Sequence, residues 1–369
     1  MPDIRKDEPS RLEEFPIHAP QLRDSERIIQ VYLPPDYFES NEHYPVIYLQ
    51  DGYYLFNPEW IRDCHYDETL DKLFYLGKLE GIIAVDIFAS GTNRWDEYSP
   101  WVNNTMHLWN EDWSKGGGEG DAYLDFVIDT LKPYIDSHYR TLPERENTGI
   151  GGFSMGGLIS LYAGLSRPEV FSKVMAVSPA VWFAEVSEPW LSNNQLFNYV
   201  KSIDVPKNVT FYIDVGTNEW ADNLRPVKDE AGNQINFSYA WLSGAKATLT
   251  NLKNAGVPAN NVVLVIEEGG VHDTPSWDRR FGDAILWLYF NKAVYSNQLI
   301  FTLPAVSVTE AVPAEDLENT SEEGILVDSV DQKNNNDQKP ANSTLIILVT
   351  TELTAFIALF LTFKNEKLF

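Results

Sequence analysis

The stretch GIGGFSMGGLISLYAG, residues 149–164, places five glycines within five residues of a single serine, Ser154. Glycine costs roughly 0.5–1 kcal/mol relative to alanine inside a helix or strand, so it is expected where the backbone turns sharply or another atom comes close. Two interpretations compete. Either a tight strand-to-helix turn happens to hold a serine, or the pattern G-x-S-x-G holds a nucleophile in a strained, exposed turn above a sheet. The motif is short enough to arise by chance, so the rest of the chain decides between them.

The segments around this stretch alternate between strand and helix patterns. Strands are predicted at 27–38 (an edge strand), 44–52, 81–90, up to Ser154, 173–182, 209–217 and 261–270, and helices at 121–139, directly after Ser154, at 239–256 and at 276–294. Strands separated by helices in this order indicate a mainly parallel sheet with helices on both faces, the α/β class. Ser154 then lies at the carboxyl end of a strand and opens a helix, where α/β sheets bind ligands and unpaired N–H groups favour an anion.

Composition excludes several classes of function. The chain has 369 residues, 44 % of them hydrophobic, and a formal net charge of -26. So acidic a chain does not neutralise phosphates, which argues against nucleic acid as a partner. One cysteine, Cys64, rules out an intrachain disulfide and a cysteine-rich metal site, and the six histidines are scattered singly without a metal-binding spacing. Neither a metal nor an organic cofactor is expected.

The two ends of the chain differ from its middle. The first residues lack the apolar core of a signal peptide. Near the other end, STLIILVTTELTAFIALFLTF is long enough to cross a bilayer, although Glu352 opposes insertion; an amphipathic or partner-binding helix is the alternative. The sequence predicts an N-terminal extension (1–24), an α/β domain (25–304), an acidic disordered linker (305–342), a transmembrane or membrane-anchoring segment (343–363) and a short basic tail (364–369). This organisation indicates attachment to a membrane through the C-terminal segment, on a side left open, or a cytoplasmic protein if the segment does not insert.

A serine hydroxyl is a weak nucleophile and needs a base within hydrogen-bond reach. In α/β proteins with a G-x-S-x-G nucleophile, the acid and then the histidine follow the serine along the chain. The single histidine after Ser154 is His272, in a loop between the last predicted strand and the last helix. The acid is expected after the preceding strand, where Glu219 stands just past the strand end, Asp214 inside the strand and Asp222 further along the loop. Glu219 is preferred because a strand residue such as Asp214 points sideways, so Ser154, His272 and Glu219 are the predicted catalytic residues.

Two backbone N–H groups are predicted to bind the oxyanion that such chemistry creates. The first is that of Met155, at the start of the helix after the serine. The second is that of Tyr53, because the pair Asp51-Gly52 interrupts an earlier strand where the second donor normally lies. An ordinary Asp-Gly turn is the competing interpretation of that pair.

Six segments carry a resemblance to a known family: RIIQVYLPPDY, PVIYLQDGYYLF, NRWDEYSPW, GGFSMGGLISLYAG, DVGTNEW and GGVHDTPSW. Over roughly residues 25–292 they resemble, in order, the Putative esterase (esterase D-like) family of the α/β-hydrolases, which includes enterochelin and ferric-siderophore esterases, S-formylglutathione hydrolase, feruloyl esterases and mycolyltransferases. The resemblance implies an α/β-hydrolase fold with Ser154 as nucleophile, His272 as base, Glu219 as acid and an oxyanion hole at Tyr53 and Met155. Many members carry a smaller or amide residue in place of Tyr53, and the chain from 305 onward has no counterpart in the family pattern.

The same resemblance places further residues near the pocket. The predicted substrate-binding residues are Asp51, Gly52, Arg94 and Trp95, although Arg94 has a bracing role as its alternative. The segment after the strand at 81–90 holds four tryptophans, at 95, 101, 109 and 113, which either line a cover over the pocket or pack beneath a long loop.

Together these features predict a serine esterase that cleaves a small-molecule or glycan ester through an acyl-serine. One alternative is an acyltransferase that passes the acyl group to a sugar or alcohol. A second is a non-catalytic, membrane-tethered binding module, which has no need for a complete set of Ser154, His272 and Glu219. A cysteine mechanism through Cys64 and His65 is disfavoured, because adjacent residues in a helix-like stretch point in different directions.

Overall fold

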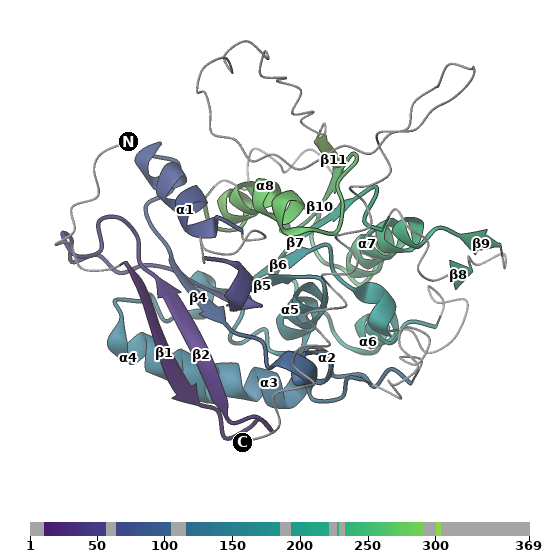
Figure 1. Ribbon diagram of the computed structural model, residues 1–369. Helices are drawn as coiled ribbons and strands as arrows, with labels where there is room; N and C mark the ends of the chain where they lie inside the picture. Colours follow the sequence, from purple (N-terminus) through teal and green to yellow (C-terminus); the bar gives the residue numbers. More distant parts are fainter. Residues whose placement is uncertain are drawn as a thin grey trace, which may run out of the picture. The chain divides into compact units, whose positions relative to one another are not determined.

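The central sheet of the computed structural model is built mainly from parallel strands (Figure 1). The order of the nine strands is β1-β2-β4-β3-β5-β6-β7-β10-β11; the pairs β1–β2 and β2–β4 are antiparallel and the other pairs are parallel. Their bounds are β1 Leu12–His18, β2 Glu26–Tyr32, β3 Val46–Gln50, β4 Ile83–Ile87, β5 Thr148–Phe153, β6 Lys173–Val177, β7 Thr210–Gly216, β10 Val262–Glu267 and β11 Ile300–Leu303. A separate ribbon pairs β8 (Val227–Lys228) with β9 (Gln234–Ile235).

Helices follow most of the parallel strands. They are α1 Tyr66–Tyr75, α2 Arg94–Glu97, α3 Gly120–Phe126, α4 Lys132–His138, α5 Met155–Ser166, α6 Gln195–Ser202, α7 Phe237–Asn254 and α8 Thr274–Ile285. A π-helical turn, Val127–Leu131, joins α3 to α4, and another, Leu286–Phe290, continues α8. Short 3-10 turns include η1 (Gly52–Tyr54) after β3 and η6 (Val181–Ala184) after β6. The structure describes residues 11–56, 64–104, 116–184, 193–220, 227–228, 233–290 and 300–303.

Two hydrophobic cores lie on opposite faces of the sheet. In β3, Val46 and Tyr48 belong to the core that contains α3, α5, α6 and α7, whereas Ile47 and Leu49 belong to the core that contains α1 and α8. Successive side chains of a strand point to opposite faces, so a strand that is apolar throughout feeds both cores. Figure 1 accordingly shows α1 and α8 on one side of the sheet and α5 and α6 on the other. The predicted α/β class with helices on both faces is confirmed.

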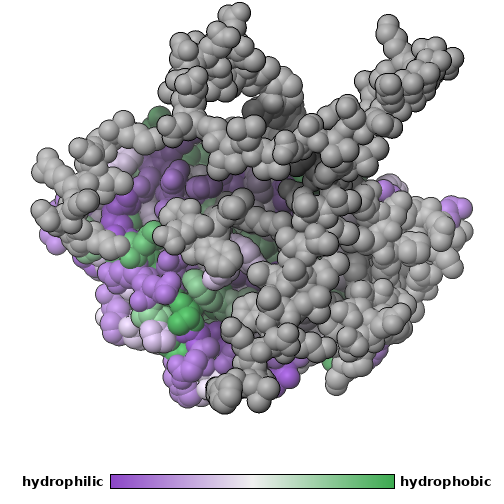
Figure 2. Space-filling view, in the orientation of Figure 1, coloured by the Kyte–Doolittle hydropathy of each residue, from purple (hydrophilic) through white to green (hydrophobic). Residues whose placement is uncertain are grey.

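The sheet begins earlier along the chain than residue 25, the predicted start of the domain. β1 lies within the predicted N-terminal extension and pairs antiparallel with β2 along its whole length. Sequence reasoning missed it because its exposed positions make its apolar alternation sparse. On the face that Figure 2 displays, hydrophilic residues predominate over this antiparallel end of the sheet, with small hydrophobic patches between them.

The predictions for the C-terminal region fall outside the described residues. The chain divides into two units, Met1–Val308 and Thr309–Phe369, and every described residue belongs to the first. The predicted linker, membrane segment and basic tail therefore stay predictions. Among the residues that the structure describes, no helix has the length and apolar character needed to span a membrane.

Candidate active site

Ser154 occupies the turn between β5 and α5, in a backbone conformation that residues other than glycine rarely adopt. Its φ is 57° and its ψ is -121°, and strain of this kind is concentrated at functional sites. A Cβ atom on Gly152 would lie 2.9 Å from Oε1 of Gln50, and one on Gly157 would lie 3.1 Å from Cα of Pro179. The glycines around Ser154 therefore let the end of β3 and the loop after β6 come up against the turn.

Three side chains from separate loops meet at this turn. His272, between β10 and α8, has its Nε2 atom 3.1 Å from Oγ of Ser154 and its Nδ1 atom 2.7 Å from Oε2 of Glu219. A carboxylate only accepts hydrogen bonds, so Nδ1 carries the hydrogen and Nε2 is left to accept from the serine hydroxyl. The backbone N–H of His272 also donates to the carbonyl of Glu219 at 3.0 Å, which ties the two loops together. This is the arrangement in which an imidazole takes the serine proton while a carboxylate holds its tautomer.

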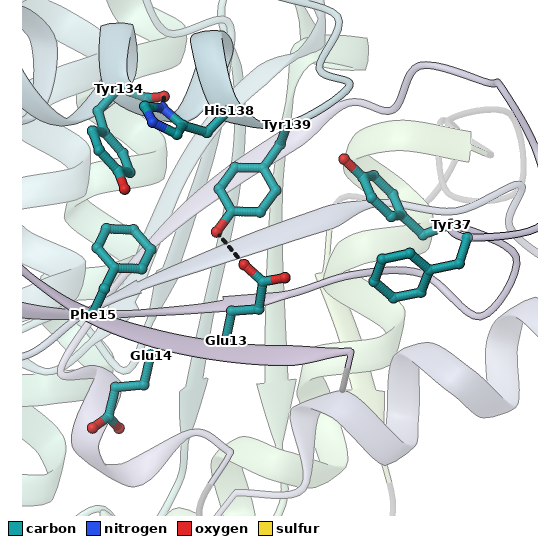
Figure 3. A pocket seen from close by; sticks show the side chains of 8 residues that line it. Glu13, Glu14, Phe15, Tyr37, Tyr134, His138 and Tyr139 are labelled. Carbon is teal, nitrogen blue, oxygen red and sulfur yellow. Dashed lines mark hydrogen bonds between the residues drawn. The ribbon is translucent and has the colours of Figure 1, made fainter. Parts of the chain in front are cut away.

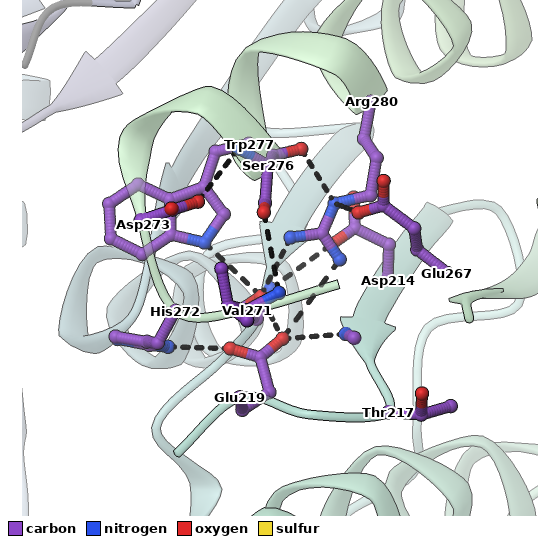
Figure 4. A network of polar contacts seen from close by, with 12 residues as sticks. Asp214, Thr217, Glu219, Glu267, Val271, His272, Asp273, Ser276, Trp277 and Arg280 are labelled. Carbon is purple, nitrogen blue, oxygen red and sulfur yellow. Dashed lines mark hydrogen bonds and ion pairs between the residues drawn. The ribbon is translucent and has the colours of Figure 1, made fainter. Parts of the chain in front are cut away.

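Of the two candidate acids that the structure describes, Glu219 is the one that contacts the imidazole. Its side chain is fully buried, and Oε1 accepts the N–H of Gly216 at 2.6 Å. Asp214, inside β7, instead has Oδ1 3.2 Å from Nη1 of Arg280. Figure 4 shows Glu219 between His272 and Arg280. Asp222 lies outside the described residues.

Burial and neighbouring charges set the two described acids apart. Burial alone would raise the pKa of Glu219, but the hydrogen bond from His272 and the charges of His272 and Arg280 outweigh it, and the pKa is lowered. For Asp214 burial outweighs the charge of Arg280, and the nearby charge of Glu219 adds to it, so the pKa rises to about 7. At neutral pH Glu219 is therefore ionised, whereas Asp214 keeps its proton to a much higher pH than an ordinary aspartate.

Sequence reasoning missed Arg280, which joins both acids from α8. Its side chain is fully buried, with Nη1 4.0 Å from Oε1 of Glu219 and Nε 3.5 Å from Oε2 of Glu267. The available signal was the pair Arg279-Arg280 in the last helix, because adjacent helical residues point in different directions. Arg279 remains near the surface, where it donates to Oε1 of Glu267 at 2.9 Å, and Arg280 turns inward.

The segments that carry the two predicted oxyanion donors lie beside Ser154. The ring of Tyr54, in η1, packs edge-on against the ring of Phe153, with 6.4 Å between centroids, so η1 adjoins the end of β5. Tyr53 precedes Tyr54 in that turn. Met155 opens α5, and the first N–H groups of a helix have no partner within the helix. The structure thus brings both segments to the serine.

Asp51 and Arg94 form a bidentate ion pair beside η1. Nε of Arg94 lies 2.6 Å from Oδ1 of Asp51 and Nη2 lies 2.7 Å from Oδ2. Asp51 is 1 % exposed, has a φ of 64° and donates its N–H to the hydroxyl of Tyr98. Gly52 is also buried, and a Cβ there would lie 2.8 Å from Cβ of Asp86. Of the four predicted substrate-binding residues, Asp51 and Gly52 are therefore interior, and Arg94 pairs with Asp51 from α2.

Aromatic rings surround His272. Its neighbours are Trp220, Trp241 and Trp277, with ring centroids at 5.4, 4.3 and 4.9 Å. Trp182 of η6 extends this group, 6.2 Å from Trp241, and Trp95 follows it at 6.3 Å. The predicted binding residue Trp95 is thus connected to the imidazole by a row of tryptophan rings.

Of the other three tryptophans in the predicted cover, the structure describes Trp101 alone. Trp101 packs against Tyr162 of α5 and Tyr199 of α6, at 5.3 and 6.2 Å, and so contacts the body of the domain. Trp109 and Trp113 lie outside the described residues.

The cysteine and histidine of the disfavoured cysteine mechanism contact residues other than Ser154, His272 and Glu219. Cys64 is 1 % exposed and its thiol points to the carbonyl of Thr274, while His65 pairs with Asp278. Within the described ranges, no cluster of His, Cys, Asp or Glu has the arrangement of a metal site. A hollow of about 620 Å³ lies by β1 and α4 (Figure 3), where the Tyr139 hydroxyl donates to Glu13 at 2.8 Å. Its lining, Glu13, Glu14, Phe15, Tyr37, Phe38, Tyr134, His138 and Tyr139, includes none of the predicted site residues.

Comparison with known proteins identifies a family of esterases and structures with a similar fold. The family model described as "Putative esterase" matches residues 21–288. The uncharacterized protein YbbA of Bacillus subtilis is 26 % identical over 263 residues, which cover 71 % of this chain and 92 % of that protein. Among solved structures, a ferulic acid esterase aligns with a TM-score of 0.54 at 22 % identity, over 75 % of this chain and 97 % of that chain. The enterobactin esterase FES of Shigella flexneri aligns with a TM-score of 0.57 at 18 % identity, over 75 % of this chain and 58 % of that chain. These likenesses confirm the α/β-hydrolase fold.

Proposed function

The chain belongs to the putative esterase family and is a carboxylic ester hydrolase, and from this premise we propose that it works through an acyl-serine on Ser154. The proposal rests on two consecutive hydrogen bonds, from Oγ of Ser154 to His272 and from His272 to Glu219. Ser154 also lies in a strained turn. A binding module does not need such a hydrogen-bonded triad. Enzymes that share it use it to make serine nucleophilic.

The proposed reaction begins when Nε2 of His272 takes the proton of Ser154 as Oγ attacks the ester carbonyl. Glu219 stabilises the resulting imidazolium and keeps its Nδ1–H in place. The backbone N–H groups of Met155 and Tyr53 bind the oxyanion, each contributing about 2.7–4 kcal/mol to the transition state. His272 then protonates the leaving alcohol, and a water molecule repeats the sequence on the acyl-serine to release the acid.

We assign esters of acids that carry a planar aromatic ring as substrates of this site. Trp220, beside His272, and Trp95, at the other end of the row of rings, are partly exposed and offer faces on which such a ring packs. One structural relative is named a ferulic acid esterase, and ferulic acid is an aromatic acid. Methyl ferulate should therefore be cleaved with a higher kcat/KM than methyl butyrate; the reverse order would contradict this assignment.

The test of the proposed chemistry is hydrolysis of a short-chain p-nitrophenyl ester by the wild-type chain and by Ser154→Ala. Turnover should fall by about 10⁴–10⁶-fold in the variant. Activity that survives the substitution would refute the role of Ser154. Product analysis with an added sugar or alcohol acceptor distinguishes hydrolysis from transfer of the acyl group to that acceptor.

A further inference from the structure

Ser178 lies directly after β6 and is held in a left-handed conformation. Its φ is 40°, an unfavourable value for a residue with a side chain. Its N–H donates both to the backbone carbonyl of Asp214, at 3.0 Å, and to the carboxylate of Asp214, at 3.1 Å. The side chain is fully buried. A strained, buried polar residue of this kind persists only where its surroundings hold it.

The hydroxyl of Ser178 has all of its hydrogen-bonding capacity in use. It accepts the indole N–H of Trp277 at 3.2 Å and an Nη2–H of Arg280 at 3.0 Å. A hydroxyl has two acceptor lone pairs and one hydrogen to donate. With both lone pairs engaged, the hydrogen points to Oε1 of Glu219, 2.6 Å away. Trp277 and Arg280, which Figure 4 shows on the same helix, thus fix the direction of that bond.

The same short segment also braces the nucleophile. The N–H of Ser154 donates to the carbonyl of Val177 at 3.0 Å, and the N–H of Ala180 donates to the carbonyl of Ser154 at 2.8 Å. Ser178 stands between these two anchors. The backbone of the segment therefore holds the serine turn while the Ser178 side chain holds the acid.

We propose that Ser178 is a positioning residue for the reaction assigned above, and this inference rests on that proposed function. Its hydroxyl orients the Glu219 carboxylate toward Nδ1 of His272, and its backbone neighbours set the position of Ser154 relative to that acid. The positions of Ser154 and Glu219, the first and last residues of the proposed triad, therefore both depend on the segment that contains Ser178. Ser178 touches neither the substrate nor the reacting atoms.

Three variants of the full-length protein separate this role from general stability. Ser178→Gly removes the hydroxyl and relaxes the φ of 40°, whereas Ser178→Ala removes the hydroxyl and keeps the strain. Thr248→Val is the control, because it deletes a buried hydroxyl whose bond among the described residues stays within α7, to the carbonyl of Gly244. Each variant is measured for kcat, KM and the pH profile of p-nitrophenyl ester hydrolysis, and for its melting temperature. The downfield proton resonance of Nδ1–H in His272 is recorded as well.

For both Ser178 variants kcat should fall about 10- to 100-fold, the size expected for a lost hydrogen bond to a charged group, with KM within about twofold. The loss should be equal in Ser178→Gly and Ser178→Ala even though their melting temperatures differ. Without the donor, the negative charge of the Glu219–His272 pair is less stabilised, so the acidic limb of kcat should move to higher pH. The downfield resonance should shift or broaden, and Thr248→Val should keep the wild-type kcat.

A wild-type kcat, pH profile and resonance in Ser178→Gly would overturn the positioning role. So would losses of kcat that merely follow melting temperature across the three variants. Failure of the proposed function looks different: the wild-type chain would then show no turnover that depends on Ser154. The resonance of His272 would still report, in that case, whether Ser178 orients Glu219.

Discussion

At the scale of single residues, the choice of acid depends on where each carboxylate stands relative to the end of β7. Asp214 points sideways from inside the strand and reaches Arg280, whereas Glu219, three residues past Gly216, turns back to His272. The extra methylene of glutamate lets Oε1 bond the end of the strand while Oε2 holds the imidazole. The two carboxylates thus have different partners because one lies inside β7 and the other in the loop after it.

Substitution of each acid by its amide should reveal this difference. Glu219→Gln should lower kcat by about 10³–10⁴-fold, because an amide no longer favours the required tautomer or stabilises the imidazolium. Asp214→Asn should lower kcat by less than about tenfold, since Asp214 meets Arg280 and the N–H of Ser178. Steady-state kinetics on one p-nitrophenyl ester measures both. A larger loss for Asp214→Asn would reverse the assignment of the acid.

The raised pKa of Asp214 predicts how stability depends on pH. The folded protein holds this proton up to about pH 7, whereas the ordinary value is 3.8. Between these values the folded state binds the additional proton, so the Asp214 contribution to the free energy of unfolding falls as pH rises. Urea unfolding from pH 4.5 to 7.5 should show the stability of the wild type declining relative to Asp214→Asn. Parallel curves for the two proteins would contradict the raised pKa.

At the scale of elements, the sequence predicts most of what places the site. Strands dense in β-branched residues and the turn at Ser154 follow from local chemistry, and so does the loop that carries His272. What the sequence does not reveal depends on packing between distant segments. The weak alternation of β1 acquires meaning only beside β2, and Arg280 resembles an ordinary surface arginine until α8 packs on the ends of β7 and β10. Ser178 likewise draws no notice without its φ of 40°.

The ion pair between Arg94 of α2 and Asp51, directly before η1, should stabilise the folded protein. Arg94→Met should destabilise the protein by about 3–5 kcal/mol, because Asp51, 1 % exposed, is left as an unpaired buried charge. The double variant Asp51→Asn with Arg94→Met should recover part of that loss, since the charge is gone. Urea unfolding of the two single variants and the double variant measures this coupling. Strict additivity would mean that the two side chains do not stabilise one another.

At the scale of the whole molecule, the formal net charge of -26 bears on substrate capture. A strongly acidic protein repels anions over a distance that salt shortens, from about 30 Å at 0.01 M to about 8 Å at 0.15 M. The KM for an ester that carries a carboxylate should therefore fall a few-fold as salt is raised over this range, while that for a neutral ester of similar size stays constant. Equal salt dependence for both esters would show that net charge does not affect capture.

We propose that ester cleavage passes through an acyl group on Ser154. The most direct test of this proposal is mass spectrometry of the full-length protein, acid-quenched during turnover of a p-nitrophenyl ester and digested. We expect one acyl group per chain, on the peptide that contains Ser154; it should be absent in Ser154→Ala and strongly reduced in His272→Gln. Rapid turnover with the acyl group on another residue, or with the same turnover in Ser154→Ala, would contradict it.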